Sequence, residues 1–221
     1  MSGNHDLELW RGSSQSKFDA LIRTILGEIN AHMKRSENPE KSFICYEDLK
    51  SIWSDRSRIQ TLLQLAFPSE HQIRFIQEHM IMILSTLIFI GATDFSSEFL
   101  ATLFNSNSGN APITDDEIPF EMNQLIFLYS KPALQQNFYT HQFRFKPVVI
   151  EVTRHQRTQV IKNPKLRLPF EYLKKDIGSG GFGKVDVVGI SPKYINEAGS
   201  IRENVSRHCH LQPQINISIG S

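Results

Sequence analysis

A glycine-rich stretch towards the carboxyl end of the chain contains the residue types best suited to chemistry. It reads DIGSGGFGKVDVV, from Asp176 to Val188, with four glycines within six residues. Because glycine lacks a Cβ, such a backbone can adopt positive φ and bring its N–H groups within hydrogen-bonding distance of a phosphate. The stretch therefore predicts a loop that contacts phosphate groups.

Two common phosphate loops fit this stretch poorly. The Walker A frame G-x-x-x-x-G-K fits Gly178 to Lys184, but Val185 stands where a hydroxyl residue must bind magnesium. The dinucleotide fingerprint G-x-G-x-x-G also fits, and Glu197 lies about where its acidic ribose partner is expected. That fingerprint opens a helix, however, whereas the β-branched residues of Lys184 to Ile190 favour a strand.

A strand, glycine loop, strand arrangement fits in every part. Tyr172 to Ile177 predicts an incoming strand, Gly178 to Gly183 a turn, and Lys184 to Ile190 a return strand. Val185 completes the pattern G-x-G-x-x-G-x-V. On these residues, the stretch from roughly Leu168 to Ile190 resembles the eukaryotic protein kinase family of Ser/Thr type. Its lead-in, LRLPFEYLKK, is similar to the entry of kinase domains in some fungal proteins.

The kinase resemblance implies that the loop backbone contacts the phosphates of ATP. It also implies that Phe182 caps the phosphates and that Val185 lies against the adenine. The implied ATP-binding residues are Ile177, Gly178, Ser179, Gly180, Gly181, Phe182, Gly183 and Val185.

Other kinase motifs do not follow the loop. No H-R-D, D-F-G or A-P-E comes after it, and neither Lys184 nor Lys193 has the V-A-I-K context of the third-strand lysine. The D-F-S at Asp94 precedes the loop and cannot be the magnesium motif. We therefore expect no catalytic residues, an inactive chain, weak or vestigial ATP binding, and magnesium only in a full-length form. We interpret the tail after Ile190 as the result of truncation, alternative splicing or a gene-model error.

Composition restricts the partners and the compartment. With 221 residues and a net charge of +1, the chain has no overall electrostatic attraction to nucleic acid or anionic membrane. Cys45 and Cys209 form no disulfide or zinc pattern, and the adjacent ligands His208, Cys209 and His210 have no second cluster. The polar amino terminus lacks a signal peptide's apolar core. We expect an intracellular protein, cytoplasmic or nuclear, with no nucleic-acid or membrane partner.

Helical periodicity dominates the first two thirds of the chain. Residues 1–14 are expected to form a disordered tail and residues 15–135 a helical domain. The first helix of this domain starts near the serines at 13–16, and its apolar residues between Phe18 and Met33 recur at intervals of three and four, which places them on one face. A second helix covers 49–66 with a break near Ser54. A third starts at Ser69, which has capping-box spacing with Gln72, includes the apolar run Met80 to Ala92, and stops near Gly91.

The apolar run is 13 residues long, whereas a membrane-spanning helix needs roughly 20, so a buried core helix is expected. Shorter helices are predicted at 95–104 and 121–129, the second ended by Lys131-Pro132, with a polar loop at 105–117 between them.

The remaining chain predicts β structure and connectors. Residues 136–167 form a strand-like segment, suggested by alternating aromatics at Phe143 and Phe145, followed by a basic connector. Residues 168–190 are a partial kinase N-lobe and residues 191–221 a polar tail. The expected fold class is therefore mainly α, a helical bundle followed by a short β element that is the incomplete first hairpin of a kinase small lobe.

Three functions remain open at the level of sequence. The first is the amino-terminal part of a Ser/Thr protein kinase, with ATP as its ligand and a helical regulatory region. The second is a helical interaction or regulatory module, with a protein partner on the bundle and a vestigial hairpin. The third is a nucleotide-binding regulator without transfer chemistry.

Overall fold

The computed structural model describes most of the chain in two compact units. The described residues are 3–34, 42–63, 68–92, 95, 102–104, 112–128, 131–152, 158–161, 163, 165–180, 183–190, 194–197 and 216–219. A helical unit comprises Met1–Met33 and Ile44–Lys146, and a β unit comprises Lys34–Phe43 and Pro147–Ser221. The described chain is mainly helical, as the sequence predicts.

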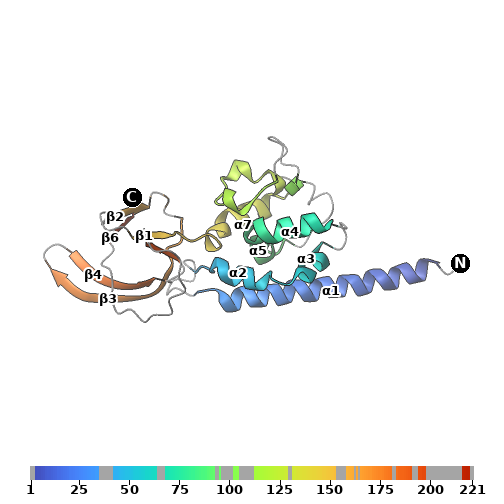
Figure 1. The fold of residues 1–221 in the computed structure, drawn as a ribbon, viewed down its shortest axis with the longest axis horizontal. Helices are drawn as coiled ribbons and strands as arrows, with labels where there is room; N and C mark the ends of the chain where they lie inside the picture. Colours follow the sequence, from blue (N-terminus) through green and yellow to red (C-terminus); the bar gives the residue numbers. More distant parts are fainter. Residues whose placement is uncertain are drawn as a thin grey trace. The chain divides into compact units, whose positions relative to one another are not determined.

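The helical unit contains α-helices joined by short 3-10 turns (Figure 1). Its α-helices are α1 (Gly3–His32), α2 (Tyr46–Ile52), α3 (Arg56–Leu62), α4 (Glu70–His79), α5 (Ile81–Phe89) and α7 (Pro132–His141). Residues 102–104 are also helical. The 3-10 turns are η2 (Asp115–Glu117), η3 (Met122–Gln124), η4 (Ile126–Leu128) and η5 (Gln142–Arg144).

Helix α5 is the centre of this unit. Every residue from Ile83 to Ile88 is at most 1 % exposed, including the polar Ser85 and Thr86. The helix contacts α1, α2, α4 and α7, which surround it (Figure 1). The indole N–H of Trp53 donates a hydrogen bond of 2.9 Å to the Ser85 hydroxyl, so this buried polar pair is satisfied. The expectation of a buried core helix is confirmed.

The length and composition of the described helices can be compared with those of a membrane-spanning helix. None of them combines the length and the apolar composition that crossing a bilayer requires.

Helix α1 starts earlier than the sequence predicts. It begins at Gly3 and not near residues 13–16, so most of the predicted disordered tail, residues 1–14, lies within it. Asp6 and Glu8 near this end favour a helix because carboxylates interact well with the positive end of the helix dipole. Further along, Glu28 accepts a 2.9 Å hydrogen bond from Arg58, which ties α1 to α3.

Two predicted helix boundaries are confirmed by their capping contacts. The break near Ser54 separates α2 from α3, and the Asp55 carboxylate caps α3 by accepting the Ser57 N–H at 2.9 Å. Ser69 and Gln72 form the predicted capping box at the start of α4.

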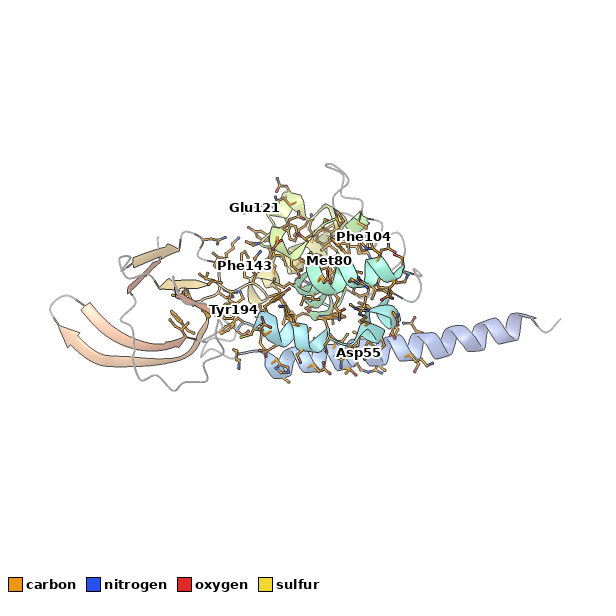
Figure 2. All side chains as sticks on the ribbon, in the orientation of Figure 1. Asp55, Met80, Phe104, Glu121, Phe143 and Tyr194 are labelled. Atoms are coloured by element: carbon orange, nitrogen blue, oxygen red, sulfur yellow. The ribbon has the colours of Figure 1, made fainter. Side chains whose placement is uncertain are left out.

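The third predicted helix is two helices in the structure. Met80, which is fully buried in the middle of the unit (Figure 2), has φ −135° and ψ 13° and ends α4 before α5 begins. At the other end of α5, Gly91 has φ 78°, its N–H donates to Ile88 O, and the Ala92 N–H donates to Leu87 O at 2.9 Å. These two bonds form a Schellman motif, so the predicted stop near Gly91 is confirmed.

The region after the polar loop differs from expectation. The predicted helix 121–129 is two 3-10 turns, η3 and η4. Lys131-Pro132 does not end a helix but starts α7, because proline is tolerated in the first helical turn, where its missing N–H costs nothing. Only residues 95 and 102–104 of the predicted helix 95–104 are described.

The strand predicted around Phe143 and Phe145 was wrong, since these residues belong to η5 and the turn after it. The alternation misleads because Gln142 does not face solvent. It is fully buried, accepts the Phe120 N–H at 2.7 Å and donates to the Phe120 carbonyl at 2.8 Å. A side-chain amide thus satisfies both main-chain groups of Phe120 inside the core.

The β unit consists of three two-stranded pairings. Strands β3 (Phe170–Gly180) and β4 (Gly183–Ile190) pair antiparallel. Strand β1 (Ile150–Val152) pairs in parallel with β5 (Ile195–Glu197), and β2 (Thr158–Ile161) with β6 (Asn216–Ile219). The predicted basic connector and polar tail therefore both contain strands. In the same unit, Phe43 packs edge-on against Tyr194, with ring centroids 5.9 Å apart.

Gly27 and Gly91 provide a matched test of how the backbone at Gly91 ends α5. A Cβ would meet nothing within 4 Å at either Gly27 or Gly91. Only the backbone differs, so Gly91→Ala should lower the free energy of unfolding by about 1 kcal/mol because of its positive φ. Gly27→Ala, inside α1, should raise it by up to about 1 kcal/mol. Urea unfolding measures both, and shifts of the same sign would contradict this reading of the Gly91 backbone.

Candidate functional site

The glycine-rich stretch lies in the antiparallel β3–β4 pair, whose strands run side by side (Figure 1). Gly178 pairs with Val185, Ser179 with Lys184, and Gly180 with Gly183. The strands therefore extend further into the stretch than the predicted turn, Gly178 to Gly183, allows. Glycine has no side chain to prevent strand pairing, so extended backbone is open to it as well as turn conformations.

The eight residues implied by the kinase resemblance fall into two groups. Ile177, Gly178, Ser179 and Gly180 lie at the end of β3, and Gly183 and Val185 at the start of β4. Gly181 and Phe182, which join the strands, lie outside the described residues. The pairing brings the first glycine of the pattern directly opposite its valine.

The pairing is irregular immediately before the glycines. Strand β3 advances four residues, from Lys174 to Gly178, while β4 advances two, from Val187 to Val185. Extra residues on one strand bend it and increase its local twist. The two strands are therefore expected to twist more strongly next to the glycines than at the end of the hairpin that begins at Phe170.

Metal-ligand clusters have no counterpart in the described part of the chain. Its His, Cys, Asp and Glu side chains include no group of three that could hold a metal ion. His208, Cys209 and His210 lie outside the described residues.

Among the described residues, Asp115 of the helical unit is an ionisable group with a strongly raised pKa. Its carboxylate is buried, and its two oxygens each accept one main-chain N–H at 2.9 Å, from Met82 and Ile83. These are the second and third residues of α5, whose own flanking residue, Met80, has no side-chain acceptor. In most helices a Ser or Asp directly before the first turn provides the cap. Asp115 caps α5 instead, although it lies more than thirty positions further along the chain.

Burial determines the proton affinity of this cap. Desolvation raises the pKa of Asp115 to about 7, although the hydrogen bonds from Met82 and Ile83 and the nearby charge of Lys146 oppose the rise. The Lys146 ammonium donates to the main-chain carbonyls of Asp115 and Asp116, each at 3.0 Å. Burial also lowers the pKa of Lys146.

Sequence reasoning placed Asp115 in a polar loop and missed its role. One signal was present, because Thr114 and Glu117 have the T-x-x-E spacing of a capping box. The structure forms that box, with the Thr114 N–H donating to the Glu117 carboxylate at 2.9 Å. The pattern could have predicted the turn, but no local pattern identifies the distant helix that the turn caps.

Comparisons with known proteins add no family to these observations. Searches of protein-family models, curated proteins and solved structures found no match to this chain.

Removing the Asp115 carboxylate should be costly. Asp115→Ala leaves two buried N–H groups of α5 without an acceptor, so we expect the free energy of unfolding at pH 7 to fall by about 2 kcal/mol or more. The adjacent Asp116 is exposed, and Lys146 bonds only to its main-chain carbonyl, so Asp116→Ala is the matched control and should lower the free energy of unfolding far less. Urea unfolding of both variants gives the comparison, and equal losses would show that the cap contributes nothing specific.

Proposed function

We propose that residues 168–190 are the first hairpin of a protein-kinase-like small lobe and contact ATP phosphates through the backbone of Gly178–Gly183. The observation that supports this proposal is the pairing of Gly178 with Val185 and of Gly180 with Gly183. A Rossmann or Walker A loop leads from its glycines into a helix, whereas these glycines lead from one strand into its antiparallel neighbour.

The chemistry of the hairpin rests on its main chain. In this proposal, the N–H groups of Gly178–Gly183 provide hydrogen bonds to phosphate oxygens, and the missing Cβ atoms let those oxygens approach closely. Phe182 would shield the phosphates and Val185 would pack on the adenine, as the kinase resemblance implies. Because the hairpin covers one side of the nucleotide, the affinity we expect is weak, with a Kd of about 1 mM.

The helical unit has the role of a regulatory region in the same proposal. Its buried apolar residues form one core cluster, which extends from Phe18 to Phe145. A region with its own core can be stable by itself and can bind or control a neighbouring domain. We assign no transfer chemistry to the described residues.

Nucleotide titration of the full chain tests the hairpin proposal. We expect ATP, followed by amide chemical shifts, to perturb the backbone of Gly178–Gly183 more than any helical residue. Inorganic triphosphate should reproduce much of this pattern, because the proposed contacts are made to phosphates. Gly180→Val should weaken binding about tenfold or more, since its branched side chain occupies the space through which a phosphate approaches.

Gly189→Val is the matched control for that variant. Gly189 lies in β4 of the same hairpin, opposite Tyr172 and away from the loop, so the control makes the same chemical change without altering the proposed site. It should bind ATP as the wild type does. The proposal would be abandoned if about 10 mM ATP shifted no hairpin amide, or if both valine variants bound equally well.

A further inference from the structure

We propose that the Thr114–Glu117 turn is a proton-controlled latch on the amino end of α5, which opens as the Asp115 side chain loses its proton. This inference is independent of the nucleotide proposal. It depends on the position of one buried carboxyl group and on the contacts that hold its turn in place.

The closed latch is held at two points. The Asp115 carboxyl group meets the N–H groups of Met82 and Ile83 at 2.9 Å. On the other side of the turn, the Lys146 ammonium donates to the carbonyls of Asp115 and Asp116 at 3.0 Å. Lys146 is the last residue of the helical unit, so the turn joins the start of the central helix to the end of this unit.

The described residues provide no ion pair to the Asp115 carboxylate. Lys146 bonds instead to the main chain of the turn. The side chain is only 4 % exposed, so ionisation places a negative charge where water does not reach it. Two neutral N–H donors compensate only part of that cost, as the raised pKa of about 7 indicates.

Opening the latch would return the carboxyl group to water, where its pKa is about 4. The closed state then binds the proton more tightly than the open state, so opening releases a proton in the interval between about pH 4 and about pH 7. The equilibrium constant for closing the latch is therefore largest below this interval. It falls about tenfold per pH unit as the pH rises through the interval. Above about pH 7 both states are ionised and the equilibrium no longer changes.

Other ionisable groups lie around the latch. Lys146 and Asp116 act on Asp115 directly, with opposite signs. Tyr46 of α2 has a raised pKa, caused mainly by burial and then by the charges of Asp115, Glu47 and Asp116, so it is neutral throughout this interval.

Other charged groups lie on the elements that neighbour α5. His141 and Arg144 both contact the ring of Phe89, with centroid distances of 5.4 Å each, at the opposite end of α5. The helix itself carries no charged residue, and Glu117 is bonded to the Thr114 N–H. Glu78 and His79, which end α4 before Met80, lie 3.8 Å apart and are both about half exposed, so Asp115 is the buried acid at this end of α5.

Amide hydrogen exchange of the full chain tests the latch. Intrinsic exchange rises about tenfold per pH unit, and latch opening should add about another tenfold per unit for amides that it protects. For Met82 and Ile83 we therefore expect the logarithm of the rate to rise with a slope near two up to about pH 7 and near one above it. Trp53 and Leu63, which bond within the ends of α2 and α3, should keep a slope near one.

Two variants and one direct titration complete the test. Asp116→Asn should retain the slope near two, and Asp115→Asn, which cannot ionise, should reduce it to one. If Asp115→Asn does not fold, the carboxyl carbon of Asp115 can be titrated by NMR in the wild type, with an expected midpoint of about 7. A slope of one at Met82 and Ile83, a slope of two at all amides alike, or a carboxyl midpoint near 4 would each overturn the latch.

Discussion

The helical unit depends on how the amino end of a buried apolar helix satisfies its hydrogen bonds. Helix α5 is surrounded on all sides, so the free N–H groups of its first turn cannot bind water. An unsatisfied buried group costs about 1–3 kcal/mol, and two of these groups are satisfied by the Asp115 carboxylate. The position of the 114–117 turn, the contacts of Lys146 and the placement of α5 against its neighbours are consequences of that requirement.

The two ends of α5 solve the same problem by different means. At the carboxyl end, Gly91 and Ala92 close the helix with residues next to it in sequence. At the amino end, Met80 has no suitable side chain and the partner comes from a turn far along the chain. The first solution can be predicted from sequence because glycine alone signals it. The second cannot, since nothing near Met80 identifies Asp115 as its partner.

The same distinction explains which other elements the sequence predicts. The break near Ser54 and the start at Ser69 rest on local capping residues, and both are correct. The region around Gln142 was misread because a buried amide bonded to Phe120 looks, in sequence, like the polar face of a strand. Gln142 and Asp115 were misread for the same reason, because each is a polar side chain that was assigned to solvent but makes a long-range contact inside the core.

The hairpin that holds the glycines was predicted in the order of its elements but not in its detail. The order strand, glycines, strand follows from the β-branched residues after Gly183, and the structure has that order. The irregular pairing after Lys174 has no sequence signature, because the register of a hairpin is set by the fit of the two strands together. The parallel pairs β1–β5 and β2–β6 were also missed, since parallel strands are joined by long connections that leave no local turn signal.

These parallel pairs have a consequence for the order in which the chain folds during its synthesis. Every segment of the helical unit has been made once Lys146 is complete. In the β unit, Ile150 must wait for Ile195 and Thr158 for Asn216, and closing such long loops is entropically costly and slow. The helical unit can therefore fold during synthesis before the β pairings that need Ile195 and Asn216 form.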